Sequence, residues 1–130
     1  MDKIKAISIF YYFSAAYDGT LGLVFLIFPL SIYNWYEITP PNHVGYVHFP
    51  AALLIVFAIM FINIARQPLH NRNLIPYGIL LKLSYCSVVF GHWFTTGIPD
   101  MWKSFAIVDL IFGVVFVWTY IHIGKELKEN

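Results

Sequence analysis

Four apolar stretches, each about as long as one bilayer crossing, dominate this sequence. They cover residues 7–28, 47–65, 74–95 and 102–123. A helix needs roughly 20 apolar residues to cross about 30 Å of hydrocarbon. In lipid, backbone N–H and C=O groups must pair within the protein, and a helix achieves this inside a single segment. The sequence therefore predicts an all-α integral membrane four-helix bundle that forms one domain over residues 1–130.

The composition agrees with lipid as the main solvent. Hydrophobic residues make up 59% of the chain and charged residues only 12%, whereas a soluble domain carries about 25% charged residues. The mean hydropathy is +0.68. The net charge is +1, and no basic cluster is long enough to bind phosphates along a nucleic acid. We expect the lipid bilayer as a partner and no nucleic acid.

Short basic segments give the orientation. Six basic residues flank the stretches on one side: Lys3, Lys5, Arg66, Arg72, Lys125 and Lys128. On the other side lies only Lys103. Because Lys and Arg are enriched in cytoplasmic loops, both termini are predicted to be cytoplasmic.

The prolines mark the ends of the helices. Five of the seven fall in the proposed connections: Pro29, Pro40, Pro41, Pro68 and Pro99. Pro50 and Pro76 are expected in the first turn of their helices, where a missing N–H is harmless.

Aromatic residues gather at the predicted outer boundary. They are Tyr33, Trp35, Tyr36, Trp93 and Trp102. Trp and Tyr are enriched where the bilayer meets water. We interpret these residues as an interfacial belt.

Lys82 is a charge inside the third apolar stretch. An ammonium near the bilayer centre costs roughly 2.5 to 3.5 kcal/mol on insertion scales, so such a residue normally faces other helices and pairs. Asp18 in the first stretch and Asp109 in the fourth are the available carboxylates. The three residues are predicted to meet inside the bundle.

Counting along the helices separates these charges in depth. At 1.5 Å per residue, Lys82 lies about 12 Å from the cytoplasmic end, Asp18 about 16 Å and Asp109 about 21 Å. A helical side chain leans toward its own N-terminus, which favours Asp18 as the partner of Lys82. The count leaves the pairing of Asp109 in doubt.

Small residues surround the charges. Ser14, Asp18 and Gly22 share one helical face, and Gly78, Lys82 and Cys86 share another, with Tyr85 alongside. Small residues allow two membrane helices to approach closely. The candidate site therefore consists of Asp18, Lys82, Asp109 and Tyr85.

Several roles fit such a cluster. It can be a buried pair that fixes helix register, a cavity that binds a lipid-like or amine-bearing small molecule, or a proton relay or transport site. The protein can also be a non-catalytic accessory subunit of a larger membrane complex, or a homo-oligomer. No hydrolase or nucleotide-binding motif is present, and the sequence leaves enzymatic activity open.

Three histidines form a second candidate site. His48 begins the second stretch and His92 ends the third, so both are expected at the outer level. Two imidazoles from different helices can hold a haem in a redox subunit, and His43 would add a third metal ligand.

Two resemblances add expectations. The run Gly22 to Pro29, GLVFLIFP, within a four-span topology, resembles the small bacterial membrane proteins of the DoxX-like type. That resemblance implies a fold and a bacterial inner membrane location more than an activity. The run Lys103 to Phe112, KSFAIVDLIF, resembles a motif of EXPERA-domain proteins, the sterol isomerase and sigma-2 receptor group. That resemblance implies that Asp109 lines a pocket for a hydrophobic amine or sterol.

Overall fold

The computed structural model describes residues 2–129, and every regular element in that range is a helix. The elements are α1 (Asp2–Ile27), α2 (Pro29–Trp35), α3 (Gly45–Arg66), the 3-10 turn η1 (Arg72–Leu74), α4 (Ile75–Trp93) and α5 (Asp100–Glu129). Within this range, α1, α3, α4 with its preceding turn, and α5 are long and apolar enough to cross a membrane. The prediction of an all-α protein with four membrane-spanning helices is confirmed.

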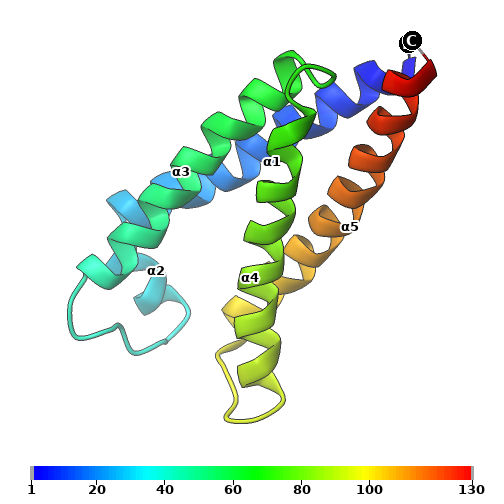
Figure 1. Cartoon of the computed structure of the whole chain (residues 1–130). Coiled ribbons are helices and arrows are strands. Elements are labelled where there is room, and N and C mark those ends of the chain that lie inside the picture. The colour runs from blue at the N-terminus through cyan, green and yellow to red at the C-terminus, as the bar shows by residue number, and fades with distance from the viewer. Residues whose placement is uncertain (1, 130) are drawn as a thin grey trace.

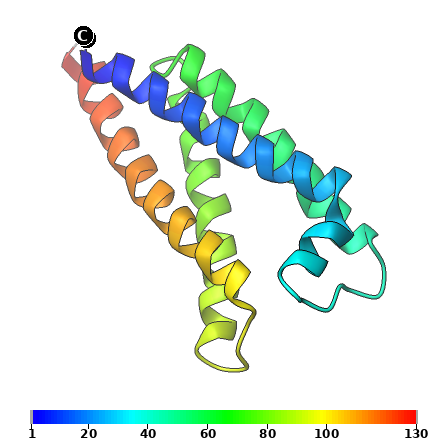
Figure 2. The ribbon, with the colours of Figure 1, turned by 180° about the vertical axis from the view of Figure 1, so that it is seen from behind.

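The four long helices form two pairs. α1 packs along α3, and α4 packs along α5, while contacts between the pairs are fewer. The pairs converge where α1 begins, α5 ends and α3 connects to α4, and they diverge toward the opposite end (Figure 1). The view from behind shows the same V (Figure 2). We call these the closed end and the open end.

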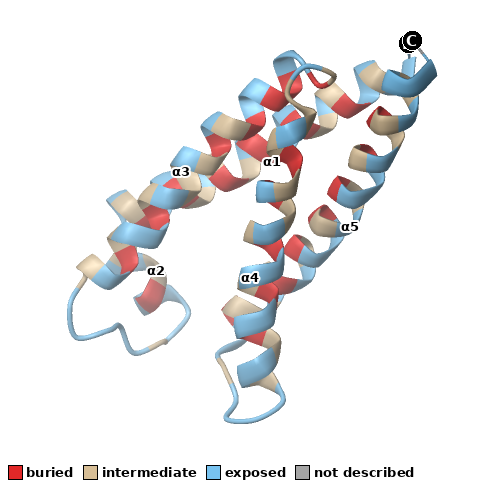
Figure 3. Ribbon diagram, viewed as in Figure 1, coloured by how far each residue is buried: buried red, intermediate tan, exposed pale blue. Residues whose placement is uncertain are grey.

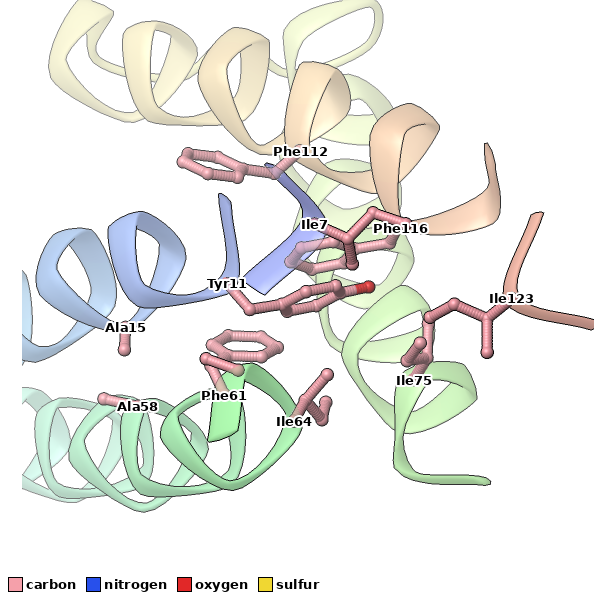
Figure 4. Close-up of a cluster of buried hydrophobic side chains, with 11 residues drawn as sticks. Ile7, Tyr11, Ala15, Ala58, Phe61, Ile64, Ile75, Phe112, Phe116 and Ile123 are labelled. Carbon is pink, nitrogen blue, oxygen red and sulfur yellow. The ribbon is translucent and has the colours of Figure 1, made fainter. Parts of the chain in front are cut away.

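An aromatic cluster joins the two pairs near the closed end. Tyr11 of α1 lies between the rings of Phe61 and Phe116 (Figure 4), with centroids 6.1 and 5.1 Å away. The Tyr11 hydroxyl also shares a 2.6 Å hydrogen bond with the Thr119 hydroxyl. Aromatic pairs at these separations add about 0.5 to 1.5 kcal/mol each beyond their buried area. The cluster thus anchors α1, α3 and α5 to one another.

The outward faces of the helices are apolar and exposed. Figure 3 shows exposed residues along the outside of all four long helices and buried residues facing between them. Exposed side chains include Ile9, Phe13, Ile59, Leu83 and Val114. An apolar surface of this extent is typical of a protein whose solvent is lipid.

The helix boundaries differ from the apolar stretches. α1 begins at Asp2 rather than residue 7, and α5 continues to Glu129 rather than 123. An apolar stretch ends where the bilayer ends, whereas the hydrogen bonding of a helix continues through polar residues into water. The helix α2 lies in the segment that was expected to be a connection. Pro29 follows the end of α1 and occupies the first turn of α2, where its missing N–H is harmless.

The expected position of Pro50 is wrong. Pro76 lies in the first turn of α4 as predicted, but Pro50 lies inside α3. The helix begins earlier than residue 47, at Gly45, whose N–H donates to His43 Nδ1 at 2.9 Å. This bond satisfies an N–H that has no partner within the helix. Pro50 therefore cannot donate to the carbonyl of Tyr46, one turn earlier.

Candidate functional site

Lys82 joins two carboxylates from different helices. Its ammonium donates to Asp18 Oδ1 at 2.9 Å and Oδ2 at 3.1 Å, and to Asp109 Oδ1 at 3.0 Å. The Lys82 and Asp18 side chains are 2% and 1% exposed. α1, α4 and α5 each supply one member of this triad, which spans the gap between the two helical pairs. The predicted meeting of the three charges is observed.

The expected pairing of Lys82 with Asp18 is confirmed, and Asp109 is a second partner. Asp109, whose pairing the count left in doubt, binds the same ammonium as Asp18. Counting residues treated the helices as parallel rods that begin at one level. The two pairs are instead inclined to each other and end at different levels (Figure 1), and the four-carbon lysine stem covers the remaining distance.

Aromatic rings enclose the ammonium on its remaining sides. The Lys82 nitrogen lies 5.2 Å from the centroid of Phe112 and 5.7 Å from that of Tyr17. A cation within about 6 Å of a ring centroid is attracted by the ring. The Tyr17 hydroxyl is buried and has no hydrogen-bond partner within residues 2–129. Sequence reasoning missed Tyr17, which lies directly before Asp18 but gives no separate signal.

A cavity of about 380 Å³ adjoins the triad on the side of the open end. Asp18 and Asp109 line its inner end. Lys82 does not line this cavity, so the triad meets the cavity through its two carboxylates. Apart from these acids and the tyrosines, the lining is apolar: Leu21, Phe25, Val47, Pro50, Ala51, Leu54, Leu81, Trp102 and Phe105.

An aromatic bridge closes the cavity toward the open end. Trp102 of α5 lies 5.9 Å from the Phe25 ring and 6.1 Å from the Tyr33 ring. These side chains connect α1 and α2 to α5 at the level where the two helical pairs diverge. Burial raises the pKa of Tyr33, which lies in α2 outside the long helices, so its hydroxyl stays neutral. The interpretation of Tyr33 and Trp102 as belt residues did not include their part in this wall.

The cavity reaches the molecular surface beside α3. Tyr46, at the start of α3, lines it and is 70% exposed, and the exposed Pro50 follows one turn later. Leu81 and Tyr85 of α4 form the facing wall. The exposed lining residues named here thus lie on α3, a helix that is apolar enough to span a membrane.

Tyr85 lines the cavity but does not bind the triad. Its hydroxyl donates to the carbonyl of Trp102 at 3.0 Å. This bond ties α4 to the beginning of α5 and so holds Trp102 in the aromatic bridge. Tyr85 is thus a wall residue of the predicted site rather than a partner of Lys82.

The histidine site is not assembled. His43 Nδ1 accepts the Gly45 N–H, and His92 Nδ1 bonds the hydroxyl of Thr96 at 2.9 Å. His48, at the start of α3, and His92, at the end of α4, belong to parts of the helices that lie apart in Figure 1. Within residues 2–129, no three His, Cys, Asp or Glu side chains gather to hold a metal. Two residues expected at the same depth in the membrane do not meet when their helices diverge.

Comparisons with protein-family models, with curated proteins and with solved structures find no match for this chain.

Proposed function

We propose that this protein binds a small amphipathic amine inside the bilayer. The ammonium group would lie against Asp18 and Asp109, and the apolar part would extend along the cavity toward the aromatic bridge. The observation that carries the proposal is the cavity itself, whose apolar walls end at two carboxylates that share a single lysine.

Charge balance favours a cation as the ligand. With both acids ionised, the triad carries one negative charge more than Lys82 neutralises. An uncompensated charge in low dielectric costs several kcal/mol. Asp109 uses only Oδ1 to bind Lys82, and its side chain is 13% exposed, more than Asp18 at 1%. Asp109 is therefore the better placed acid to accept a ligand ammonium.

The size of the cavity limits the ligand. Its 380 Å³ lies near the lower end of the range of about 300 to 1,000 Å³ for small-molecule sites. This volume suits one single-chain amphiphile rather than a two-chain phospholipid. Aromatic faces such as those of Phe25 and Trp102 suit an apolar chain.

The setting of the site completes the proposal. We place the protein in the bacterial inner membrane with the closed end cytoplasmic, in agreement with the basic residues at that end and the DoxX-like resemblance. The cavity then opens toward the outer leaflet. The EXPERA-like run from Lys103 to Phe112 contains the same acid, Asp109, that the charge argument selects.

Native mass spectrometry of the purified protein tests this function. We expect one bound n-decylamine per chain and weaker binding of 1-decanol, which has the same chain without the charge. Asp109→Asn should weaken n-decylamine binding at least tenfold. The matched control is Asp100→Asn, since Asp100 is exposed and pairs only with Lys103 in the described chain.

A second pair of variants tests the position of the ligand. Leu54 lines the cavity, whereas its neighbour Leu53 does not. Leu54→Trp should fill the cavity and abolish binding, while Leu53→Trp should leave it unchanged. Equal binding by all variants, or no binding of the amine, would refute the proposal and favour a triad that only fixes helix register in an accessory subunit.

A further inference from the structure

We propose that the site exchanges one proton for each cation it binds, an inference that rests on the proposed amine-binding function. The triad offers two carboxylates and one ammonium at 2.9 to 3.1 Å. It is therefore neutral only when it holds one further positive charge. A proton on one carboxyl group supplies that charge when the cavity is empty.

The arrangement gives the proton a defined place. Asp18 contacts Lys82 through both oxygens, whereas Asp109 contacts it through Oδ1 alone. Asp109 Oδ2 has no hydrogen-bond partner within residues 2–129, and the side chain lines the cavity. The exchangeable proton thus resides on Asp109, at the position that a ligand ammonium would take.

No other group near the cavity supplies this proton. The titratable side chains that line a cavity with Asp109 or lie beside the Lys82 ammonium are Asp18 and Tyr17 from α1, Lys82, Tyr85 and Cys86 from α4, Tyr33 from α2 and Tyr46 from α3. Tyrosine and cysteine titrate in water at about pH 10 and 8.5, and lysine at about 10.4. The remaining acid, Asp18, is fully engaged by Lys82. Proton exchange in the acid to neutral range therefore belongs to Asp109.

The exchange balances in charge and atoms. The bound proton leaves Asp109 for water, the carboxylate remains, and the cation takes its place. The triad is neutral before and after the exchange. A cation that entered without release of the proton would leave one uncompensated positive charge in the apolar interior, at a cost of several kcal/mol.

This coupling gives the protein a measurable property. While the empty site is protonated, each unit of pH increase should raise the apparent affinity for a cation about tenfold, because one proton is released on binding. Proton and amine therefore compete for one site. A membrane protein with this property can convert a difference in pH into a difference in amine occupancy.

The test uses decyltrimethylammonium, whose charge does not titrate. Isothermal titration calorimetry of the full chain, in two buffers with different ionisation enthalpies, gives the number of protons released. We expect one proton per cation and a dissociation constant that falls about tenfold per pH unit. Asp109→Asn should bind the cation weakly and release no proton, whereas Asp100→Asn should match the parent.

The outcomes separate the two proposals. Binding of the cation with no proton release at any pH, down to the most acidic pH at which the protein stays folded, would overturn the exchange and leave the amine-binding function standing. Absence of binding by both decyltrimethylammonium and n-decylamine at every pH would overturn both. The parent protein alone decides between exchange and simple binding, so the test does not depend on whether Asp109→Asn folds.

Discussion

Lys82 shows how one residue can organise a membrane protein. Its ammonium contacts two acids and lies near the rings of Tyr17 and Phe112. Each contact offsets part of the cost of a charge in lipid. Removing the ammonium would leave two carboxyl groups buried against each other. We therefore expect Lys82 to contribute more to stability than either acid.

We expect Lys82→Met to destabilise the protein by about 3 to 5 kcal/mol, the range for breaking a buried ion pair from one side. Thermal unfolding in mild detergent measures the loss. The same substitution at Lys103, whose partner Asp100 is exposed, should change stability by less than about 1 kcal/mol.

A double variant separates pairing from packing. Asp18→Asn in the Lys82→Met background should cost less than Asp18→Asn in the parent, by about 1 to 3 kcal/mol. Additive losses would show that the 2.9 Å contact between Lys82 and Asp18 contributes no coupling.

The members of the triad and the pairing of Lys82 with Asp18 were predictable from sequence. Charged residues are rare in apolar stretches, so the sequence alone indicates Asp18, Lys82 and Asp109. Whether the second acid, Asp109, also reaches Lys82 depends on the tilt between helices, and tilt is set by contacts between distant residues. Asp109 was therefore left in doubt, and Tyr17 was missed.

At the scale of elements, α1 and α3 are held together by close contact at Gly22. A Cβ atom on Gly22 would lie 2.7 Å from the Ala51 carbonyl oxygen and 2.9 Å from Ile55 Cγ1. A carbonyl oxygen of the backbone cannot move aside as a flexible side chain can. The predicted role of small residues on this face is thus observed, although Gly22 serves the contact with α3 rather than with the charged helices.

Gly22→Ala should destabilise the protein by about 1 to 3 kcal/mol through overpacking. Gly91 gives a matched control, since a Cβ atom there meets nothing within 4 Å. Gly91→Ala should be neutral or stabilise by up to about 1 kcal/mol. Equal effects of the two substitutions in detergent unfolding would contradict the close contact of α1 and α3.

The connection between α3 and α4 is fastened to α5 by Arg72. Its Nε donates to the Tyr120 carbonyl at 2.9 Å, and its guanidinium carbon lies 3.7 Å from the centroid of the Tyr120 ring. Gly124 makes room, because a Cβ atom there would lie 2.5 Å from an Arg72 nitrogen.

We expect Arg72→Met to loosen this connection. Losing a stacked, charged hydrogen bond costs about 1.5 to 3 kcal/mol, so hydrogen exchange in residues 67–74 should accelerate at least tenfold. Arg66→Met, at an exposed position, is the control. Unchanged exchange in the Arg72 variant would show that the contact does not hold the connection in place.

Helix cores were predictable from sequence and helix ends were not. Hydropathy places the centres of α1, α3, α4 and α5, because burial in lipid requires apolar side chains. The extension of α5 to Glu129 and the early start of α3 at Gly45 depend on local hydrogen bonds that hydropathy does not report. The helix α2 was missed because it is too short to cross a bilayer.

For the whole molecule, the orientation in the membrane can be tested at two exposed loop positions. His70 lies in the connection at the closed end and Thr96 in a connection at the open end. In intact cells, a membrane-impermeant thiol reagent should label Thr96→Cys, and it should label His70→Cys only after lysis. The parent, whose one cysteine is buried, should remain unlabelled. The reverse pattern would invert the predicted topology.

The V arrangement was beyond sequence reasoning. Which helices pair depends on side-chain fit between segments far apart in the chain, such as Gly22 against Ala51 or Trp102 against Phe25. In the sequence alone, a glycine such as Gly22 indicates only close packing, and a tryptophan such as Trp102 indicates only a membrane interface. The cavity follows from the divergence of the pairs, so its walls from α2 and α3 were not predictable, although Asp18, Tyr85 and Asp109 were expected at the site.

The divergence of the two helical pairs also has a consequence for the surrounding bilayer. The pairs spread apart toward the open end (Figures 1 and 2), so we expect the protein to occupy more area in the leaflet at the open end than in the other. Insertion therefore displaces unequal numbers of lipids from the two leaflets. Such a tapered shape fits best in a membrane that curves toward its narrow end, and the protein should concentrate where the bilayer already has that curvature.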